Sequence, residues 1–442
     1  MKLLIVSYSY FPSTAPRALR WTAVAEYWAD RGHSVDVVSA RRPGSQSFEV
    51  RNGVRIHRIA DALGLTKARV SASPPSGPEP NARPRYRSRP RVFADLARRI
   101  YDHTWKRIYW PDYACLWILP AYHLARKLVT LNAYDALVSV SFPFTSHVVG
   151  LLLRRDFAQR PWVCDIGDPF SYADQTPSNN SALYSGLNSR IEKRILRSAT
   201  AAAVSNDETA KKYVELFGLD PAHFTTIPPL ASAEILGRNG ENRIEERGPS
   251  QAIRLVFLGI LYKRIRDPEF LLKILSRLAD LPDMPPFEVH FFGEAGGCEE
   301  LFRAYRDALG TRLCVHDRVD RARAVDILLG ADVLVNIGNK TPYQLPSKVI
   351  EYAATGKPIL NIAAIRADST QKALQGYPSS LTVVAADHVS DALLRQVKEF
   401  VQTPCAADKE LLRAYLEPFR VSSIAEQYLA LARLENRRDP RL

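Results

Sequence analysis

Hydrophobic and polar positions alternate along this chain in blocks typical of strand–helix–strand units. Residues 2–8 form a short apolar run, and residues 18–31 carry apolar side chains at helical spacing until Gly32 ends the helix. Residues 35–39 form the next predicted buried strand. A strand, a helix and a strand of these lengths predict a βαβ unit, and therefore a parallel sheet with right-handed crossovers.

The alternation continues in two series. In the first, the predicted strands are 136–141, 161–165 and 201–205, and the predicted helices are 146–157, 187–198 and 207–217. In the second, the predicted strands are 254–258, 288–292, 312–316, 333–337 and 358–362, and the predicted helices are 269–279, 299–309, 323–329 and 348–354. We therefore predict an α/β protein with two doubly wound, Rossmann-like domains.

Polar interruptions set the predicted domain boundaries. Residues 232–251 are polar and rich in turn residues, so we predict a linker there, between a first domain at 1–231 and a second at 252–417. The last segment, 418–442, contains a helix around 423–434 that we expect to pack back on the first domain. Within the first domain, residues 71–91 are rich in Pro, Ser and Arg and predict a mobile loop.

The composition is that of a globular protein. Of the 442 residues, 46% are hydrophobic and 24% are charged. No apolar run approaches the roughly 18 residues of a membrane span, and the continuous apolar stretch Leu3–Val6 is shorter than the ~7–15 residues of a signal peptide core. The five cysteines have no CxxC pair and no metal-ligand spacing, so we expect reduced core thiols. Together these features predict a cytoplasmic protein.

Positive charge is concentrated in one segment. The net charge is +13, and residues 83–107 carry nine Lys or Arg against two Asp. Within this segment Phe93, Leu96 and Ile100 fall on one face of a predicted basic amphipathic helix, and the aromatic residues Trp105, Tyr109 and Trp110 follow. Such a surface attracts nucleic acid, anionic lipid or an anionic substrate, and charge alone does not choose among them.

The most informative stretch is 344–358, which reads QLPSKVIEYAATGKP. It predicts a loop feeding a helix, with Ser347 as N-cap and Lys348 in the first turn. A cation there opposes the helix dipole, whereas a phosphate would meet free N–H groups, the dipole and the Lys charge together. Glu351, one turn on, is placed to accept hydrogen bonds from a ribose diol. The alternative is an ordinary capped helix followed by a turn into a strand.

This stretch resembles the donor-site motif LPSKxxEYxxxGKP of family 4 glycosyltransferases, which have the GT-B architecture of two Rossmann-like domains facing across a cleft. Four further stretches resemble the family in the same order. They are YFP at 10–12 with Arg17 or Arg20 after it, SFPFTSH at 141–147 with PWVCDIGDPF at 161–170, IEK at 191–193, and FLGILY at 257–262 with DP at 267–268.

The resemblance implies roles for individual residues. Glu351 would bind the ribose, Lys348 would lie near the diphosphate or sugar, and a cation after the strand at 254–258 would neutralise the leaving diphosphate. Arg266 fits this last role best; Lys263 and Arg264 either share it or belong to a solvated loop. The predicted donor-binding residues are Gly259, Lys263, Arg264, Pro346, Ser347 and Glu351, and the predicted catalytic residues are Asp168, Arg266 and Lys348. Arg17, Arg20, His147 and Asp165 are predicted to lie on the acceptor side or to orient the sugar.

Some of these positions have a second interpretation, and some depart from the family. His147 is equally typical of a histidine satisfied within the first turn of a helix, and Asp168 is equally typical of an Asp that starts a turn before Pro. The glycines at 293–297 lack the GxGxxG spacing of a dinucleotide-binding loop. Tyr343 stands where the family usually has a carboxylate facing the transferred sugar, so the identity and orientation of that sugar are left open. The loop 165–168 also lacks the family's His.

We therefore predict a glycosyltransferase that moves a sugar from a nucleotide diphosphate sugar to a lipid-linked, polysaccharide or small-molecule acceptor, with retention of configuration. No metal and no cofactor are expected, because no carboxylate cluster of the DxD kind stands at a predicted strand end. The basic segment predicts contact with the anionic inner face of the cytoplasmic membrane; the alternative is a helix simply packed on the first domain, and no nucleic acid is expected. The alternatives are a sugar-nucleotide epimerase or hydrolase on the same fold, a nucleic-acid-binding protein that uses the basic segment, and a non-catalytic sugar-nucleotide scaffold.

Overall fold

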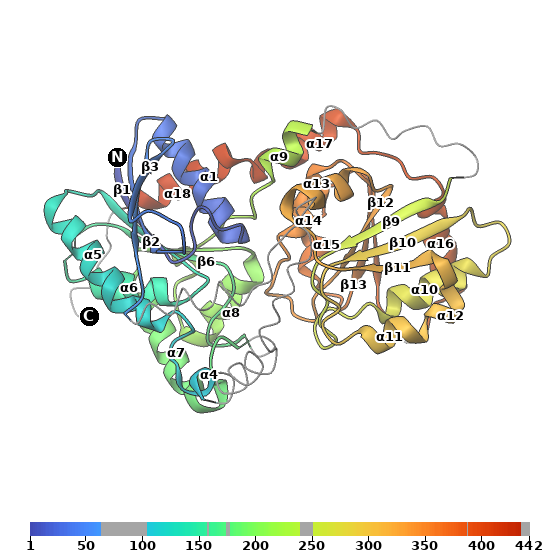
Figure 1. The fold of residues 1–442 in the computed structure, drawn as a ribbon, viewed down its shortest axis with the longest axis horizontal. Coiled ribbons are helices and arrows are strands. Elements are labelled where there is room, and N and C mark those ends of the chain that lie inside the picture. The colour runs from blue at the N-terminus through green and yellow to red at the C-terminus, as the bar shows by residue number, and fades with distance from the viewer. Residues whose placement is uncertain (63–103, 157–158, 174–176, 239–250, 387, 435–442) are drawn as a thin grey trace, which may run out of the picture. The chain divides into compact units, whose positions relative to one another are not determined.

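The computed structural model describes the chain except for residues 63–103, 157–158, 174–176, 239–250, 387 and 435–442, and divides it into two units (Figure 1). The first unit comprises Met1–Ile227 and Val421–Leu442, and the second comprises Pro228–Arg420. Each unit is built on one largely parallel sheet with helices packed against it. The prediction of two doubly wound, Rossmann-like domains is therefore confirmed.

The sheet of the first unit has the order β3-β4-β2-β1-β5-β6-β7-β8. Its pairs are parallel except for β3 and β4, which run antiparallel. The strands are β1 (Lys2–Ser7), β2 (Ser34–Ala40), β3 (Phe48–Arg51), β4 (Val54–Ile59), β5 (Ala136–Val140), β6 (Trp162–Ile166), β7 (Ala201–Val204) and β8 (Phe224–Thr226).

Helices from both ends of the chain belong to the first unit. They are α1 (Pro16–Asp30), α4 (Trp105–Ile108), α5 (Ile118–Leu131), α6 (Thr145–Leu153), α7 (Ser181–Ser198), α8 (Asp207–Phe217) and α18 (Val421–Ala432), with 3-10 turns at Cys115–Trp117 and Pro221–His223. The indole N–H of Trp28 in α1 donates to the carbonyl oxygen of Ala425 in α18 at 3.1 Å. The chain thus returns to its first unit, and α18 packs against α1.

The sheet of the second unit is parallel throughout, in the order β11-β10-β9-β12-β13-β14. The strands are β9 (Ile253–Leu258), β10 (Phe287–Phe292), β11 (Leu313–His316), β12 (Val333–Ile337), β13 (Ile359–Ala363) and β14 (Ser380–Val384). Successive residues of β9 enter two different cores: Leu255 and Phe257 belong to one, and Val256 and Leu258 to the other. Both faces of this sheet are therefore covered, which is why β9 reads as a nearly continuous apolar run.

The helices of the second unit cover these two faces. They are α9 (Ala233–Arg238), α10 (Glu269–Ala279), α11 (Glu299–Ala304), α12 (Arg306–Leu309), α13 (Arg321–Leu329), α14 (Lys348–Ala354), α15 (Ser369–Ala373), α16 (Asp391–Gln402) and α17 (Lys409–Leu416), with 3-10 turns at Gly310–Arg312 and Glu417–Phe419. Helix α9 lies inside the predicted linker 232–251, so that prediction is wrong for its first part. The reason is Ile235, which is fully buried in the core of the second unit.

Strand order also indicates where a ligand would bind. In an open parallel sheet, ligands bind outside the carboxyl ends of the strands, where the strand order reverses. This switch lies between β1 and β5 in the first unit and between β9 and β12 in the second. The predicted site residues follow β1, β5 and β6 in one unit and β9 and β12 in the other.

Two predictions concern segments that the structure leaves undescribed. The predicted mobile loop 71–91 and the apolar face of Phe93, Leu96 and Ile100 lie outside the described residues. Among the residues that are described, no helix combines the length and apolar character that crossing a membrane requires.

Candidate functional site

Two cations of the second unit are held at the carboxyl end of β9. The ammonium group of Lys348 donates to the carbonyl oxygen of Leu258 at 3.1 Å, and Nη1 of Arg266 donates to the carbonyl oxygen of Ile260 at 3.1 Å. Leu258 and Ile260 flank Gly259. Three predicted site residues, Gly259, Arg266 and Lys348, are therefore brought together at the switch point of this sheet.

The charge environment of Lys348 favours an anion. Burial lowers the pKa of Lys348 to about 8; Glu351 opposes this shift, whereas Arg266, Arg321 and Arg318 add to it. Nearby cations disfavour the ammonium form because like charges repel. An anion bound among these groups would relieve that repulsion.

Arg266 is the inward-facing member of the predicted basic loop. Its Nε and Nη2 donate to Oδ1 of Asn339 at 3.3 and 3.0 Å. The Asn339 amide in turn donates to the carbonyl oxygen of Gln344, just before α14, at 3.3 Å. The side chains of Lys263 and Arg264 are exposed instead. The geometry thus favours Arg266 over these two neighbours as the cation at the strand end.

Glu351 is partly engaged by a residue that the sequence did not single out. Its Oε1 accepts a hydrogen bond from Nη1 of Arg321, the first residue of α13, at 2.8 Å. The same guanidinium donates from Nη2 to Oγ of Ser232 at 2.9 Å. This pairing fixes the Glu351 carboxylate in one orientation. No motif marks Arg321 in the sequence, because the partners come from different helices.

Ser347 does not cap α14 as predicted. It occupies the N-cap position, but its backbone is already helical, at φ −58° and ψ −25°, and its side chain makes no capping hydrogen bond. The carbonyl oxygens of Pro346 and Ser347 instead accept from the N–H groups of Val349 and Ile350, each at 3.2 Å. The chain therefore enters α14 through a continuous turn, and the predicted capping role of Ser347 is wrong.

The glycine-containing loop after β10 packs on the loop after β9. Gly293 has φ 132°, and a Cβ there would lie 1.9 Å from the carbonyl oxygen of Gly259. Gly296 has φ 53°, and a Cβ there would lie 1.7 Å from the carbonyl oxygen of Leu261. Only glycine permits this backbone and this approach. These glycines therefore support the loop that carries Gly259 and Arg266.

In the first unit, Arg17 lies against the loop after β6. Its Nη1 is 3.0 Å from both carboxylate oxygens of Asp165. A Cβ at Gly167 would lie 2.6 Å from Nε of Arg17, so the guanidinium needs glycine at that position. The side chain of Arg17 is 20% exposed, and that of the neighbouring Asp168 is exposed. Arg17, predicted to lie on the acceptor side, and Asp168, predicted to be catalytic, therefore both reach solvent.

The loop that carries Asp168 is anchored by Glu192. This buried carboxylate accepts from the backbone N–H groups of Phe170 and Ser171, each at 2.9 Å, and from the hydroxyl of Tyr213 at 2.6 Å. Glu192 lies in the IEK stretch, which the sequence linked to the family without a physical reason. Its role is to hold the turn after Asp168.

Asp165 and Arg20 belong to a buried network rather than to an accessible surface. The Asp165 carboxylate also accepts from the hydroxyl of Tyr428 at 2.6 Å and from the indole N–H of Trp21 at 2.7 Å. Arg20 donates to the Tyr428 hydroxyl at 2.9 Å. Arg20 is 4% exposed and Asp165 is 1% exposed. The prediction that they meet the acceptor or the sugar directly is therefore corrected: they fix Arg17 and α18 from within.

Ionisation of Asp165 depends on that network. Burial alone would raise the pKa of its carboxyl, but the guanidinium groups of Arg17 and Arg20 and the hydrogen bonds from Tyr428 and Trp21 lower it overall. Asp165 is thus an anion that holds Arg17 in place.

His147 is a core residue, contrary to its predicted place on the acceptor side. It is 1% exposed, and its Nδ1 lies 2.7 Å from Oγ of Ser139. Burial lowers the pKa of His147 to about 4, so the ring is neutral at neutral pH. The ring is a buried core group whose one hydrogen bond among the described residues is to Ser139 on β5, not to the first turn of its own helix.

The five cysteines are all free, but only two of them are core thiols as predicted. Cys164 and Cys298 are buried, Cys115 and Cys314 are half-buried, and Cys405 is exposed.

Comparison with known proteins finds a family model that matches part of the chain. Residues 18–229 match the family model described as a glycosyl transferase 4-like domain. This range covers most of the first unit and supports the predicted glycosyltransferase class. No protein with a curated description matches the chain in sequence.

Solved structures resemble the chain over nearly its whole length. Sucrose-phosphate synthase from Thermosynechococcus elongatus has 16% identity and a TM-score of 0.63, with 98% of each chain covered. An α,α-trehalose-phosphate synthase (UDP-forming) from Burkholderia vietnamiensis has 14% identity and a TM-score of 0.59, with 98% of this chain and 100% of that one covered. HepE from Anabaena, solved with UDP-glucose, has 14% identity and a TM-score of 0.54 at the same coverage. At these identities the likeness shows a shared fold, the GT-B architecture.

Proposed function

We propose that this chain is a glycosyltransferase that uses a nucleoside diphosphate sugar and binds its diphosphate beside Gly259. The observation that carries the proposal is the pair of cations, Lys348 and Arg266, hydrogen-bonded to the carbonyl oxygens on either side of that glycine. Breaking a sugar–phosphate bond develops negative charge on the departing diphosphate, and fixed cations that meet this charge lower the barrier. Both cations are held in place before any ligand arrives.

We assign binding of the donor's nucleoside, through its ribose, to Glu351. One of its carboxylate oxygens is engaged by Arg321, and we propose that the other accepts from the ribose hydroxyls. HepE, which shares the fold, was solved with UDP and with UDP-glucose. A uridine diphosphate sugar is therefore the first donor to test.

Arg17 and Asp168 are assigned to the acceptor or to the transferred sugar. Asp168 is an exposed carboxylate in a loop fixed by Glu192, and Arg17 is held over Gly167 by Asp165. A fixed carboxylate and a fixed guanidinium suit the orientation of sugar hydroxyls, since one accepts and the other donates hydrogen bonds. Tyr343 replaces the family's usual carboxylate, so sugar contacts at that position differ from those of the family.

Two further parts of the proposal rest on the family resemblance. We propose that transfer retains the anomeric configuration, which the anomer of the isolated product will report. We also propose that transfer needs no divalent ion, because Lys348 and Arg266 supply the charge that would otherwise be required at the leaving diphosphate.

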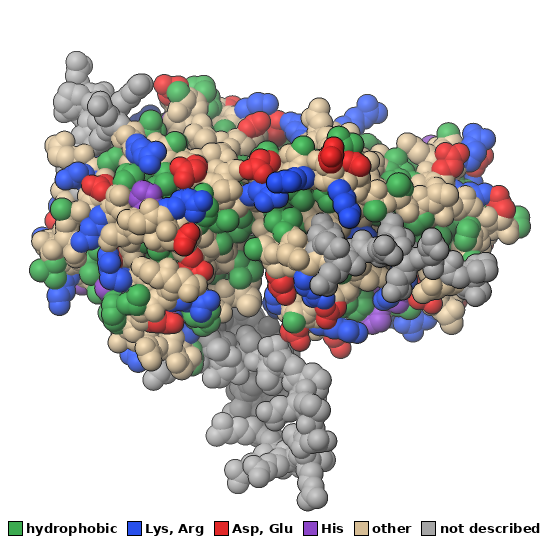
Figure 2. Space-filling model, turned by 90° about the horizontal axis from the view of Figure 1, so that it is seen from above, with side chains coloured by type: hydrophobic (Ala, Val, Ile, Leu, Met, Phe, Trp, Pro, Cys, Tyr) green, Lys and Arg blue, Asp and Glu red, His purple; other side chains and the backbone are tan. Residues whose placement is uncertain are grey.

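The acceptor is proposed to be a lipid-linked or polysaccharide intermediate at the inner face of the cytoplasmic membrane. This rests on the basic segment 83–107, most of which lies outside the described residues. On the face drawn in Figure 2, the Lys and Arg side chains of the described residues lie among Asp and Glu side chains. That mixed surface gives no support to the nucleic-acid alternative.

Product analysis separates the proposed activity from its rivals. The protein is incubated with UDP-glucose and other nucleotide sugars, with and without lipid-linked and oligosaccharide acceptors. A transferase releases nucleoside diphosphate in step with glycosylated acceptor. An isomerised nucleotide sugar formed without acceptor would indicate an epimerase, free sugar would indicate a hydrolase, and binding without turnover would indicate a scaffold.

A further inference from the structure

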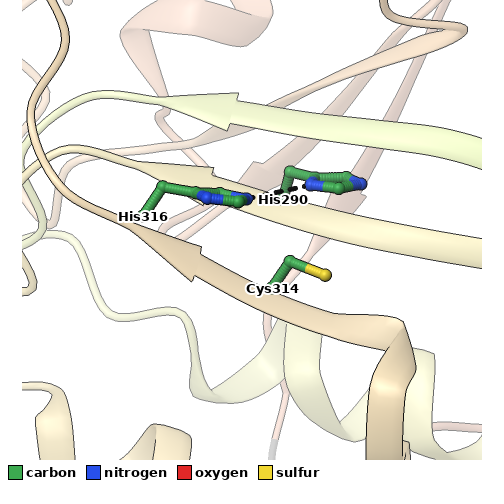
Figure 3. A group of neighbouring side chains, drawn as sticks. All are labelled: His290, Cys314 and His316. Atoms are coloured by element: carbon green, nitrogen blue, oxygen red, sulfur yellow. Dashed lines mark hydrogen bonds between the residues drawn. The ribbon is translucent and has the colours of Figure 1, made fainter.

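Two histidines and a cysteine meet on one face of the second sheet, near its edge. His290 lies on β10, and Cys314 and His316 lie on the neighbouring edge strand β11 (Figure 3). His290 is in register with Cys314, and residues two apart on a strand point to the same face. The sequence analysis found no metal spacing because it considered the cysteines alone, whereas this group joins side chains across two parallel strands.

The distances suit a metal ion. Nδ1 of His290 lies 3.0 Å from Nε2 of His316, with the two ring planes 8° apart. One ligand atom from each of the three residues lies within 4.8 Å of the others. A tetrahedral zinc ion, with Zn–N near 2.0–2.1 Å and Zn–S near 2.3 Å, separates its ligand atoms by about 3.3–3.6 Å. Coordination therefore requires side-chain rotation that replaces the hydrogen bond between the histidines and brings ligand atoms up to 4.8 Å apart to about 3.5 Å.

The neighbouring side chains orient the two rings. Oε2 of Glu288 lies 3.0 Å from Nε2 of His290, so that nitrogen donates to the carboxylate and leaves Nδ1 to face His316. A carboxylate in this position behind a histidine ligand fixes the tautomer and raises ligand basicity. The ring of Phe292 stacks on His316, with centroids 4.2 Å apart, and restrains that ring as well.

We propose that His290, Cys314 and His316 form a zinc site that clips the edge strand β11 to β10. Two imidazoles and a thiolate are a ligand set that zinc prefers. All three side chains are half-buried, so the fourth position is open to water. Burial and the carboxylate of Glu288 raise the pKa of the Cys314 thiol while Arg254 lowers it, so zinc must displace the thiol proton, and the positive charge of Arg254 opposes the metal ion itself. Zinc binding here does not require the proposed sugar transfer to be correct.

Cobalt(II) titration tests the site, because its spectrum reports both geometry and sulfur ligation. The full chain, without a histidine tag, is titrated with Co²⁺ and the bound ion is then displaced with Zn²⁺. We expect one equivalent of Co²⁺ with the intense visible bands of a four-coordinate site and a thiolate charge-transfer band, both lost on adding Zn²⁺. Zinc should also raise the melting temperature. A wild-type spectrum typical of six-coordinate cobalt, without the thiolate band, overturns the proposal.

Matched variants identify the ligands. Cys314→Ser should abolish the thiolate band, whereas Cys405→Ser, which alters an exposed cysteine, should keep it. Glu288→Gln should weaken zinc binding by roughly 10- to 100-fold, as expected for a group behind the ligand, and His316→Asn by more. Arg254→Gln should tighten zinc binding. Circular dichroism verifies that each variant is folded. Retention of the thiolate band in Cys314→Ser, or wild-type zinc affinity in folded His316→Asn, would refute the assignment.

Discussion

The ammonium group of Lys348 donates a 3.1 Å hydrogen bond to the carbonyl oxygen of Leu258, the last residue of β9. The same carbonyl accepts from the hydroxyl of Tyr352 at 3.1 Å, and that hydroxyl accepts from the Leu258 N–H at 2.9 Å. Helix α14 is therefore attached to the end of β9 by two side chains one turn apart. Lys348 is therefore held in place in the absence of a ligand, which is the condition for electrostatic preorganisation.

Nucleoside diphosphate binding should depend on pH through Lys348. The pKa of this lysine is about 8 in the free protein, and a bound diphosphate favours the charged form and raises it. Affinity should therefore decline as the pH rises above about 8, and binding near that pH should take up a proton. Calorimetry in two buffers of different ionisation enthalpy measures the uptake. Lys348→Arg, which stays charged, should bind without this pH dependence; the same dependence in that variant would exclude Lys348 as its source.

Glu351→Gln should weaken binding of nucleoside diphosphates by about 1.5–3 kcal/mol, roughly 10- to 150-fold, if the carboxylate holds the ribose. Inorganic pyrophosphate, which has no ribose, should bind the Glu351→Gln variant at least as tightly as it binds the wild type. The matched control is Glu234→Gln, because Glu234 lies 3.6 Å from the same Arg321 on another helix. Equal losses for pyrophosphate and nucleoside diphosphate would show that Glu351 acts only through Arg321.

The fold was more predictable than the orientation of the site residues. The predicted helix start pointed to Lys348, whereas Arg266 was chosen from the family resemblance. Arg20 follows Arg17 by one turn of α1, yet one side chain is buried under Tyr428 while the other is 20% exposed. A sequence pattern gives the helical face but not the depth at which each turn lies. Tyr428, 263 residues from its partner Asp165, carries no local signal at all.

Other elements were missed for a related reason. Strand β4 buries Val54 and Ile56, but Arg58 is also buried there, 4% exposed and paired with Glu49. A buried arginine breaks the apolar pattern on which strand prediction relies. Asn339 has no distinguishing neighbours in the sequence either. Its importance comes from connecting Arg266 to the loop before α14.

Gly167→Ala should displace Arg17, because the added Cβ would lie 2.6 Å from its Nε. We expect turnover to fall while affinity for nucleoside diphosphate, which is assigned to the second unit, stays within about twofold of wild type. Arg17→Ala should show the same pattern, and the double variant should be no worse than either. Gly186→Ala is the control, since a Cβ there meets nothing within 4 Å. Additive losses in the double variant would mean that Gly167 acts independently of Arg17.

The basic segment should bind anionic membranes. Each Lys or Arg near an anionic bilayer contributes about 1 kcal/mol, so a few of the nine in 83–107 hold the protein at the surface. We expect co-sedimentation with vesicles that contain phosphatidylserine, none with purely zwitterionic vesicles, and release by high salt. Replacing Arg85, Arg87, Arg89 and Arg91 by Ser should reduce binding without affecting activity on a short soluble acceptor. Failure of the wild type to bind anionic vesicles at low salt would argue for a soluble acceptor.

The central claim is that Lys348 and Arg266 receive the leaving diphosphate. Calorimetric titration of UDP and UDP-glucose tests it most directly. The proteins compared are the wild type and the variants Arg266→Ala, Lys348→Ala and Lys263→Ala. The account predicts losses of about 1.5–3 kcal/mol for UDP in the first two variants. The loss in Arg266→Ala should be smaller for UDP-glucose, because the free diphosphate carries the charge that develops on leaving. Lys263→Ala, which alters an exposed neighbour, should bind both ligands like the wild type. Wild-type affinity for UDP in Arg266→Ala and Lys348→Ala, with the loss appearing in Lys263→Ala instead, would contradict the account.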